Sequence, residues 1–377
     1  MNDIRIKKLA SNLLKHSINI QSNESLLVEL LGIEGLPLAK ELIKQAESMN
    51  VKVFFNIINY ELLRVMLENA SEDQIKIYAK YDLSRMKDMD AYIGIRANEN
   101  TAELIDVPRE KLEIYNKYYT APVHIEERVK NTKWCILRYP NNSMAQMSNM
   151  SLEKFEDFYF NVCNLDYSKM SKLMDNLVNI MKKTDKVHIL GKDTDLTFSI
   201  KGMTVGKGIG KANIPDGEVA TVPVRTSVNG YITYNTETRN NGILFNNIRF
   251  EFKDGKIIKA TSNHTEELNK ILDTDKGSRY IGEFAIGLNP YINNPIGDTL
   301  FDEKINGSFH FTPGNEVDKN ENGKGNTSSI HWDIVNIQRP EYGGGEIYFD
   351  DVLVRRDGRF VLPELECLNP ENLMNLG

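Results

Sequence analysis

A histidine and an aspartate stand one residue apart in SSIHWDIVNI, residues 328–337, a segment whose β-branched and apolar residues are typical of a strand. Because residues i and i+2 of a strand face the same side, His331 and Asp333 can project together, with Cα atoms roughly 6 to 7 Å apart. His310 lies in an earlier strand-like segment and can point into the same space. Imidazole and carboxylate together suit zinc, cobalt, manganese or iron, whereas magnesium and calcium prefer oxygen ligands alone. These residues predict a divalent-metal site, and a simple hydrogen-bonded His–Asp pair is the alternative.

Two glutamates are further candidate ligands. Glu218 in NIPDGEV and Glu283 in RYIGEFAIG each follow a glycine at the head of a predicted strand and have apolar neighbours. An unpaired carboxylate is costly in such a place, so a cation is expected nearby unless the strand entry is solvated. Asp302 and Glu303, in TLFDEK, are close to His310 in sequence. They could act as a general base or support the ligands, and a surface turn is the alternative for this pair.

The first half of the chain alternates strand and helix patterns. ESLLVELLG and VKVFFNIIN are apolar enough for buried strands, and LPLAKELIKQAESM between them has the spacing of an amphipathic helix. The alternation continues with the helix pattern YELLRVMLENA and the strand patterns DAYIGIRA and KWCILRYP. It predicts an α/β N-terminal domain with an open, mostly parallel sheet. The segment 151–185 is the longest helical stretch, with Ser151 as a candidate N-cap.

The second half consists of short β-branched and aromatic runs separated by glycines. Turn signals at Lys253-Asp254-Gly255 and Arg356-Asp357-Gly358 join several of these runs, and one helix pattern, HTEELNKILDT, interrupts them. We therefore expect a mostly antiparallel β (α+β) C-terminal domain. The predicted boundary lies between Thr184 and Lys186, so that residues 1–185 form the α/β domain with its helical linker. Residues 186–377 then form the β-rich domain that binds metal and carries catalysis.

Composition excludes several classes of partner. The chain has 377 residues, of which 41% are hydrophobic and 26% charged, as in ordinary globular proteins. Its net charge of −7 would repel nucleic acid and anionic membranes, and no basic patch or long apolar run is present. The chain start lacks the features of a secretory signal. Three cysteines without CxxC spacing favour a reducing cytoplasm.

Several short motifs occur in a family-specific order. NIPDGEV, GEFAIG and TLFDEK are followed by a strand histidine with glycine four residues later, and then by IHWD. This order resembles the aminopeptidase T and aminopeptidase S family of metallopeptidases, as do the upstream segments LRYPNNSMAQMSNMSLEKFEDF and GKDTDLTFSIKG. The resemblance implies a pair of divalent metals, zinc, cobalt or manganese, bound by two glutamates, two histidines, an aspartate and a tyrosine. Five of these ligands fall on Glu218, Glu283, His310, His331 and Asp333.

The tyrosine does not carry over. In the family it follows its histidine by seven residues, and Val317 occupies that position here, although Gly314 matches the family glycine. Valine cannot coordinate a metal, so the second ion could recruit Tyr342, Tyr348, Asp302 or a water. The alternative is one tightly bound and one loosely bound ion.

The resemblance implies hydrolysis of the N-terminal residue from short peptides by a homodimer. Two metal ions would lower the pKa of a bridging water and polarise the scissile carbonyl, and one ion could do part of this. A different enzyme class remains open, because His310, His331 and Asp333 also form the two-histidine, one-carboxylate set of ring-cleaving non-haem iron oxygenases. A dihydroxypyridine dioxygenase family is similar to these aminopeptidases in overall sequence. A third alternative is a non-catalytic binding protein on the same fold.

Overall fold

The computed structural model describes residues 3–240, 242–316 and 323–376. The chain divides into two compact units: unit 1 comprises Met1–Asn164 with Gly210–Ile214, and unit 2 comprises Leu165–Ile209 with Pro215–Gly377. This division falls before the boundary predicted between residues 184 and 186. Helix α9 (Tyr167–Met181), which the prediction assigned to the first domain, belongs to unit 2.

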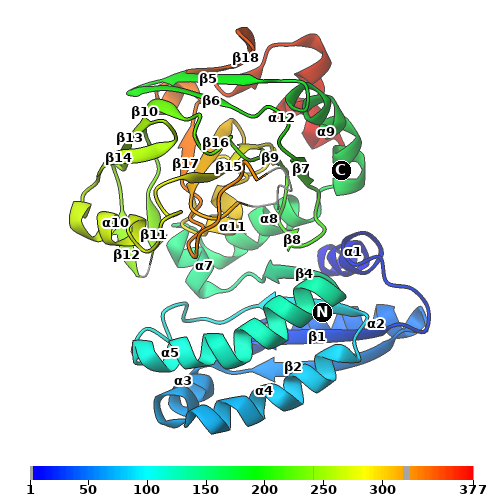
Figure 1. Ribbon diagram of the computed structural model, residues 1–377. Coiled ribbons are helices and arrows are strands. Elements are labelled where there is room, and N and C mark those ends of the chain that lie inside the picture. The colour runs from blue at the N-terminus through cyan, green and yellow to red at the C-terminus, as the bar shows by residue number, and fades with distance from the viewer. Residues whose placement is uncertain (1–2, 241, 317–322, 377) are drawn as a thin grey trace. The chain divides into compact units, whose positions relative to one another are not determined.

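Unit 1 is built on a parallel five-stranded sheet of order β2-β1-β3-β4-β8 (Figure 1). The four strands predicted in the first half are confirmed as β1 to β4. The fifth strand comes from the segment that returns to unit 1 from the second half of the chain. The strands are β1 (Ser25–Leu31), β2 (Lys52–Ile58), β3 (Ala91–Arg96), β4 (Lys133–Arg138) and β8 (Asn213–Ile214).

Several helices of unit 1 begin where a polar side chain caps them. Asn59, Ser71 and Ser151 each accept a hydrogen bond from a backbone N–H in the first turn of the helix that follows. The helices are α1 (Ile4–Asn12), α2 (Leu36–Ser48), α3 (Tyr60–Asn69), α4 (Glu72–Lys87), α5 (Arg109–Tyr115), α6 (Val129–Asn131), α7 (Asn142–Met147) and α8 (Leu152–Cys163), with π-helical turns at Leu13–Ser17 and Asn116–Arg128 and a 3₁₀ turn at Ile33–Gly35.

The predicted long helical stretch 151–185 is two helices rather than one. The first, α8, ends at Cys163, and α9 begins at Tyr167. Asp166 breaks the pattern because its side chain accepts a hydrogen bond from the backbone N–H of Lys169 and so caps a new helix. Ser151 is the N-cap that the sequence predicted, with the N–H of Lys154 as its donor.

Unit 2 contains two larger antiparallel sheets and a hairpin, which confirms the predicted fold class. One sheet has the order β14-β13-β10-β6-β5-β18-β19-β20, the second β17-β16-β15-β9-β7, and β11 pairs with β12. The predicted hairpins at Asp254-Gly255 and Asp357-Gly358 form, and all four residues have positive φ, as such turns require.

The remaining elements of unit 2 have the following bounds. The strands are β5 (Lys186–Gly191), β6 (Thr194–Ser199), β7 (Val205–Gly208), β9 (Glu218–Thr221), β10 (Asn229–Thr233), β11 (Thr238–Asn240), β12 (Ile243–Phe245), β13 (Arg249–Lys253), β14 (Lys256–Thr261), β15 (Ile281–Gly287), β16 (Ser308–Pro313), β17 (Val335–Ile337), β18 (Gly345–Phe349), β19 (Val352–Arg356) and β20 (Arg359–Phe360). Besides α9, the helices are α10 (Thr265–Leu272), which was predicted, α11 (Thr299–Asp302) and α12 (Pro370–Leu373), with 3₁₀ turns at Pro340–Tyr342, Pro363–Leu368 and Met374–Leu376.

An aromatic core joins the two larger sheets of unit 2. Phe198 of β6 lies 5.1 Å, between ring centroids, from both Phe284 of β15 and Phe311 of β16. The hydroxyl of Tyr234 donates to the carbonyl oxygen of Phe311. Because side chains alternate along a strand, the residues next to these phenylalanines face the other side of the second sheet. That other face carries Glu283 and His310.

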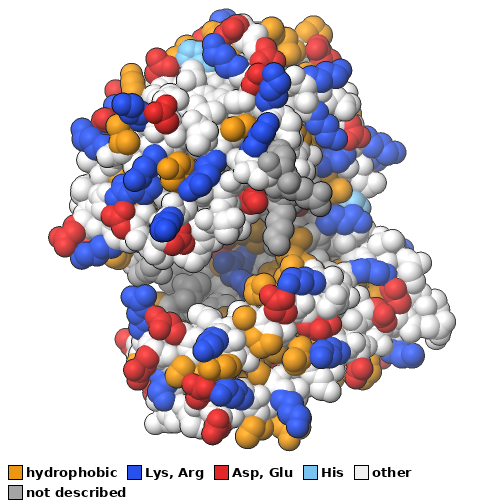
Figure 2. All heavy atoms as spheres, viewed as in Figure 1, with side chains coloured by type: hydrophobic (Ala, Val, Ile, Leu, Met, Phe, Trp, Pro, Cys, Tyr) orange, Lys and Arg blue, Asp and Glu red, His pale blue; other side chains and the backbone are white. Residues whose placement is uncertain are grey.

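Surface charges of both signs are interspersed over the face seen in Figure 2. This face shows no extended basic region of the kind that binds a nucleic-acid backbone. None of the helices among the described residues is long and apolar enough to cross a membrane.

Candidate metal centre

Three adjacent strands of unit 2 hold three of the predicted ligands. Glu218 is the first residue of β9, Glu283 the third of β15 and His310 the third of β16. In the strand register, Ala285 pairs with His310 on one side and with Ala220 on the other. These small alanines leave space on the sheet face between the longer polar side chains. The expectation that Glu218, Glu283 and His310 lie in strands is confirmed.

The expectation that His331 and Asp333 lie in a strand is wrong. His331 forms a single antiparallel bridge with Gly314, and β17 begins only at Val335. Gly314 has a φ of 112°, which turns the chain away after β16 and prevents a longer ladder. Other contacts orient the pair: the Nδ1 atom of His331 lies 2.9 Å from the carbonyl oxygen of Asn315, and the hydroxyl of Thr312 donates to Asp333 Oδ1 over 2.8 Å.

The five predicted ligands converge into two groups of three that share Glu283. In one group, ligand atoms of Glu218, Glu283 and His310 all lie within 4.8 Å of one another; in the other, Glu283, His331 and Asp333 do so. Glu283 Oε1 is 3.5 Å from His310 Nε2, and its Oε2 is 3.3 Å from His331 Nε2. One carboxylate therefore faces both groups, with one oxygen toward each.

Backbone carbonyls fix which nitrogen of each histidine faces the cluster. His310 Nδ1 lies 3.2 Å from the carbonyl oxygen of Glu303, and His331 Nδ1 makes the corresponding contact with Asn315. A carbonyl oxygen only accepts hydrogen bonds, so both Nδ1 atoms carry a proton. In the neutral imidazoles the Nε2 lone pairs are therefore directed at the carboxylates, as in metal-binding histidines.

Lys304 is a buried cation beside the cluster. Its side chain is only 3% exposed, and its Nζ lies 2.6 Å from Glu218 Oε1, 2.7 Å from Glu303 Oε1 and 3.9 Å from Asp216 Oδ1. The contact with Lys304 engages one oxygen of Glu218. The other, Oε2, is buried, has no hydrogen-bond partner and lies 3.5 Å from His310 Nε2.

Asp302 and Glu303 have different environments. Burial raises the pKa of Glu303 well above its usual range although the charge of Lys304, whose Nζ lies 2.7 Å from Glu303 Oε1, acts in the opposite direction. Through this contact with Lys304 the carboxyl lies beside the cluster. The carboxylate of Asp302 accepts hydrogen bonds from the backbone N–H groups of Ile296 and Gly297. Burial raises the pKa of Asp302 to about 7, but no contact brings it to the ligands.

The proposed replacements for the family tyrosine do not join the cluster. The Tyr342 hydroxyl donates to Asn294 Oδ1, and the Tyr348 hydroxyl donates to Glu346 Oε2. Val317 itself lies outside the described residues. Both groups of three donors are nevertheless complete without a residue at position 317.

Charge interactions shift the pKa values of the cluster. Burial lowers the pKa of His310, but Glu283 and Glu218 overcome this and raise it to about 9. Burial likewise opposes the effect of Asp333 and Glu283 on His331, whose pKa is raised to about 11. Hydrogen bonds from the two histidines hold the pKa of Glu283 below its usual value although burial acts in the opposite direction. The imidazoles therefore take up protons at neutral pH when no metal competes for them.

These residues fit a divalent metal. Three carboxylates, from Glu218, Glu283 and Asp333, outnumber the one buried ammonium, Lys304, when the imidazoles are neutral. The unpartnered oxygen of Glu218 and the inward Nε2 atoms supply ligand atoms of the kinds that zinc, cobalt and manganese accept. A bound cation would replace the imidazole protons and balance the carboxylates.

Sequence reasoning missed Lys304 and Thr312. Lysine is rarely buried, so its neighbours in TLFDEK gave no reason to place it inside the protein. Thr312 follows His310 by two residues in a strand, and this period-two spacing was the signal that could have placed it on the ligand face.

Known proteins are similar to this chain in sequence and in fold. A model of the thermophilic metalloprotease (M29) family matches residues 2–360. Aminopeptidase 2 of Geobacillus stearothermophilus is 24% identical over 370 residues, which cover 84% of this chain and 85% of that protein. The structure of wild-type AmpT from Thermus thermophilus has a TM-score of 0.78 at 21% identity, covering 95% of this chain and 99% of that chain.

A 2,5-dihydroxypyridine dioxygenase from Pseudomonas putida KT2440 also shares the fold, with a TM-score of 0.59 at 14% identity over 96% of this chain and 98% of that chain. Fold alone therefore does not separate the two enzyme classes. The family model does, because it covers nearly the whole sequence, including all five predicted ligands. The chain belongs to the thermophilic metalloprotease (M29) family.

Proposed function

We propose that this protein is a metal-dependent aminopeptidase that removes the N-terminal residue from short peptides. The observation that carries the proposal is the pair of three-donor groups joined by Glu283, in a chain that belongs to a metalloprotease family. We propose two divalent ions per chain, zinc, cobalt or manganese. Glu218, Glu283 and His310 would hold one ion, and Glu283, His331 and Asp333 the other.

Metal ions bound there supply a Lewis acid for the scissile carbonyl and lower the pKa of a water molecule. Glu303 is our candidate for the proton carrier. Its Oε1 lies 2.7 Å from Lys304 Nζ beside the ligands, and a carboxylate in that place can take a proton from the attacking water and return it to the leaving amine. Lys304 acts as a positioning residue, because its contact with Glu218 Oε1 leaves Oε2 directed at the ligand group. Asp302 has no catalytic part in this proposal, because its carboxylate is engaged by backbone N–H groups.

The exposed side of the cluster suits a peptide substrate. The side chain of His331 is 34% exposed, whereas His310 is only 1% exposed, so solvent reaches the group that contains Asp333. We further propose a homodimer in the cytoplasm; the three free cysteines, two of them buried, support the reducing compartment.

The experiment combines metal analysis with hydrolysis of aminoacyl anilides. Protein purified without chelator should contain about two zinc, cobalt or manganese ions per chain, and activity should disappear on chelation and return with metal. His331→Ala and Asp333→Ala should abolish activity and keep the fold by circular dichroism. Failure of the metal-restored wild type to cleave any of a broad panel of anilides and peptides would refute the peptidase.

The role of Glu303 has its own test. Glu303→Gln should keep the bound metal but lower kcat by about 10² to 10⁴-fold, the usual contribution of a general acid–base. Glu341→Gln, at an exposed glutamate of the same unit, is the matched control. If Glu303→Gln retains wild-type kcat, another group carries the proton.

The dioxygenase remains the rival because it shares the fold. One iron held by His310, His331 and Asp333 would satisfy that chemistry. Such a site has no need of Glu218 and Glu283, both of which lie in the cluster. One iron per chain and oxygen-dependent ring cleavage would favour the oxygenase, and absence of any metal binding would favour a binding protein.

A further inference from the structure

Unit 1 contains a cavity of about 270 Å³ between one face of its parallel sheet and the π-helical segment Asn116–Arg128. Strand residues Glu29, Tyr92 and Arg96 line its floor, and helical residues such as Tyr119 and Arg128 line its roof. Its volume is sufficient for a small organic molecule, since a cavity of about 150 Å³ can hold benzene.

The cavity contains a buried guanidinium with an unused donor. Arg128 is 6% exposed, and its Nη1 has no hydrogen-bond partner. Its Nε donates to His124 Nδ1, and its planar group lies over the rings of Tyr92 and Trp134 at 5.0 and 4.6 Å from their centroids. These contacts hold the guanidinium in place but leave Nη1 unsatisfied, which is costly unless a ligand accepts from it.

The acid in the cavity does not neutralise Arg128. Glu29 is 3% exposed; its Oε1 accepts from the Tyr92 hydroxyl over 2.7 Å and its Oε2 from Asn56 Nδ2 over 3.1 Å. Gly94 makes the first contact possible, because a Cβ at that position would come within 2.9 Å of the Tyr92 ring. Glu29 is thus occupied by neutral donors on the sheet.

The net charge around the cavity is positive. Arg96, which is exposed and has no ion-pair partner among the residues that the structure describes, adds a second guanidinium to the lining. Burial, together with the two arginines, lowers the pKa of His124 to about 4, so this imidazole is neutral at pH 7. Asp82, which accepts from the Tyr119 hydroxyl, is paired with Arg85 and adds no net charge. Among the lining residues, two arginines against Glu29 leave one positive charge for a ligand to balance.

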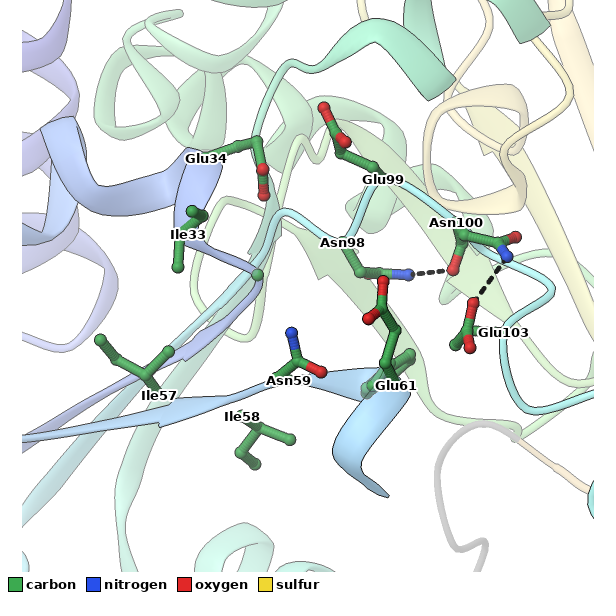
Figure 3. Close-up of a pocket in the computed structure, with 12 residues that line it drawn as sticks. Ile33, Glu34, Ile57, Ile58, Asn59, Glu61, Asn98, Glu99, Asn100 and Glu103 are labelled. Atoms are coloured by element: carbon green, nitrogen blue, oxygen red, sulfur yellow. Dashed lines mark hydrogen bonds between the residues drawn. The ribbon is translucent and has the colours of Figure 1, made fainter. Parts of the chain in front are cut away.

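The position in the fold is one that often binds ligands. The chain passes from β1 to β2 on one side of β1 and then returns to β3 on the other side, so the strand order reverses at β1. Open α/β sheets bind ligands at the carboxyl ends of the strands at such points. Figure 3 shows a second, open pocket of about 400 Å³ at these carboxyl ends, lined by residues including Ile57, Asn59 and Asn98. The two share Ile58 and Tyr60 in their linings, so the cavity adjoins this opening.

The π-helical segment supports a functional role. It runs for 13 residues with Pro122 inside it, and π-helical turns are rare and occur frequently at functional sites. Its wide spacing puts Tyr119, His124 and Arg128 on the lining of the same cavity.

We propose that this cavity binds a small organic carboxylate with an aromatic or apolar body, at a site separate from the metal-ligand cluster. The carboxylate accepts from Arg128 Nη1 and Arg96, and the body packs among the tyrosines. A single net positive charge favours a monoanionic carboxylate over a phosphate, whose charge at pH 7 is about −1.5 to −2.

The test is calorimetric titration of the metal-loaded protein with phenylacetate. Phenylacetamide has the same body without the charge, and acetate has the charge without the body. We expect phenylacetate to bind at least about tenfold more tightly than either, because charged hydrogen bonds and ring burial each contribute at that level. Equal binding of phenylacetate and phenylacetamide would overturn the carboxylate assignment, and equal binding of acetate would overturn the aromatic body.

Variants locate the site. Arg96→Gln, at an exposed position, and Arg128→Gln should each weaken phenylacetate binding at least about tenfold. Arg109→Gln, at an arginine on the surface of unit 1 that is 93% exposed, is the matched control and should bind like the wild type. Arg96→Gln should also keep wild-type aminoacyl-anilide hydrolysis without ligand. Binding that survives both Arg96→Gln and Arg128→Gln unchanged would overturn the proposal. Binding that is lost in His331→Ala instead would overturn it too, by placing the ligand at the metal centre.

Discussion

Thr312→Val tests whether a hydrogen bond outside the ligand set controls one metal position. The hydroxyl of Thr312 is fully buried and donates over 2.8 Å to Asp333 Oδ1. Valine has nearly the same shape and lacks the donor, so the substitution removes this bond and leaves the strand packed. Asp333 is then free to rotate away from His331.

The size of the effect follows from the kind of bond. A hydrogen bond to a charged group contributes about 1.5 to 3 kcal/mol, which corresponds to about 10 to 150-fold in a binding constant. Loss of groups that orient metal ligands costs about 10 to 100-fold in metal affinity, in the same range. The ion held with Asp333 should weaken by this factor, and the ion held by Glu218 and His310 should keep its affinity.

The assay is competition for zinc between the metal-free protein and a chromogenic chelator, analysed for two sites. Thr221→Val is the matched control, because Thr221 is equally buried, lies in β9 of the same sheet and donates over 2.8 Å to a backbone carbonyl, that of Thr204. Side-chain alternation puts it on the opposite face from Glu218. Identical zinc curves for the two variants, or an equal loss at both sites of Thr312→Val, would refute the reasoning.

Three further predictions follow from the same cluster. Glu283→Gln should remove both ions from each chain, whereas Glu218→Gln should remove one, because only Glu283 belongs to both donor groups. Elemental analysis after dialysis measures the metal content of each variant. Equal losses of metal in the two variants would contradict the prediction. Metal binding should release up to two protons per chain at pH 7 and should strengthen as the pH rises. The reason is that the pKa values of His310, about 9, and His331, about 11, are raised, so bound metal must displace their protons. Binding heats that do not depend on the ionisation enthalpy of the buffer would argue against this. Lys304→Met should lower the free energy of unfolding of the metal-free protein by about 3 to 5 kcal/mol, because it leaves the largely buried carboxylates of Glu218 and Glu303 without their cation. A urea midpoint equal to that of the exposed control Lys201→Met would exclude the effect.

Sequence patterns predicted the helices, strands and hairpins that are determined by residues close together in the chain. The helix spacing in Leu36–Ser48 and the apolar runs in Ser25–Leu31 and Lys52–Ile58 gave the first βαβ unit, because burial of an apolar face determines those periods. The Asp-Gly pairs gave two hairpins because few residues tolerate positive φ. The glycine-led glutamates were identified for a similar reason, since a carboxylate among apolar strand residues requires a partner.

Long-range contacts could not be predicted in this way. The two-residue strand Asn213–Ile214 pairs with β4 of unit 1, and so short a segment has no period to detect. Lys304 is buried because carboxylates distant in sequence, above all Glu218, surround it. The loop that carries His331 is shaped by its bridge to Gly314 and its contact with Asn315, so a strand pattern in the sequence was misleading there.

The geometry changes the question that the missing tyrosine raised. Position 317 was expected to decide whether the centre holds two ions, because it supplies a ligand in the family that the sequence resembles. In this structure each donor group already has three ligand atoms, and the oxygens of Glu283 face both histidines. A missing tyrosine would cost one ion a single donor, which water can replace. A missing Glu283 would cost both ions a donor and leave two imidazoles without the carboxylate between them. We therefore expect the number of ions to depend on Glu283 more than on residue 317.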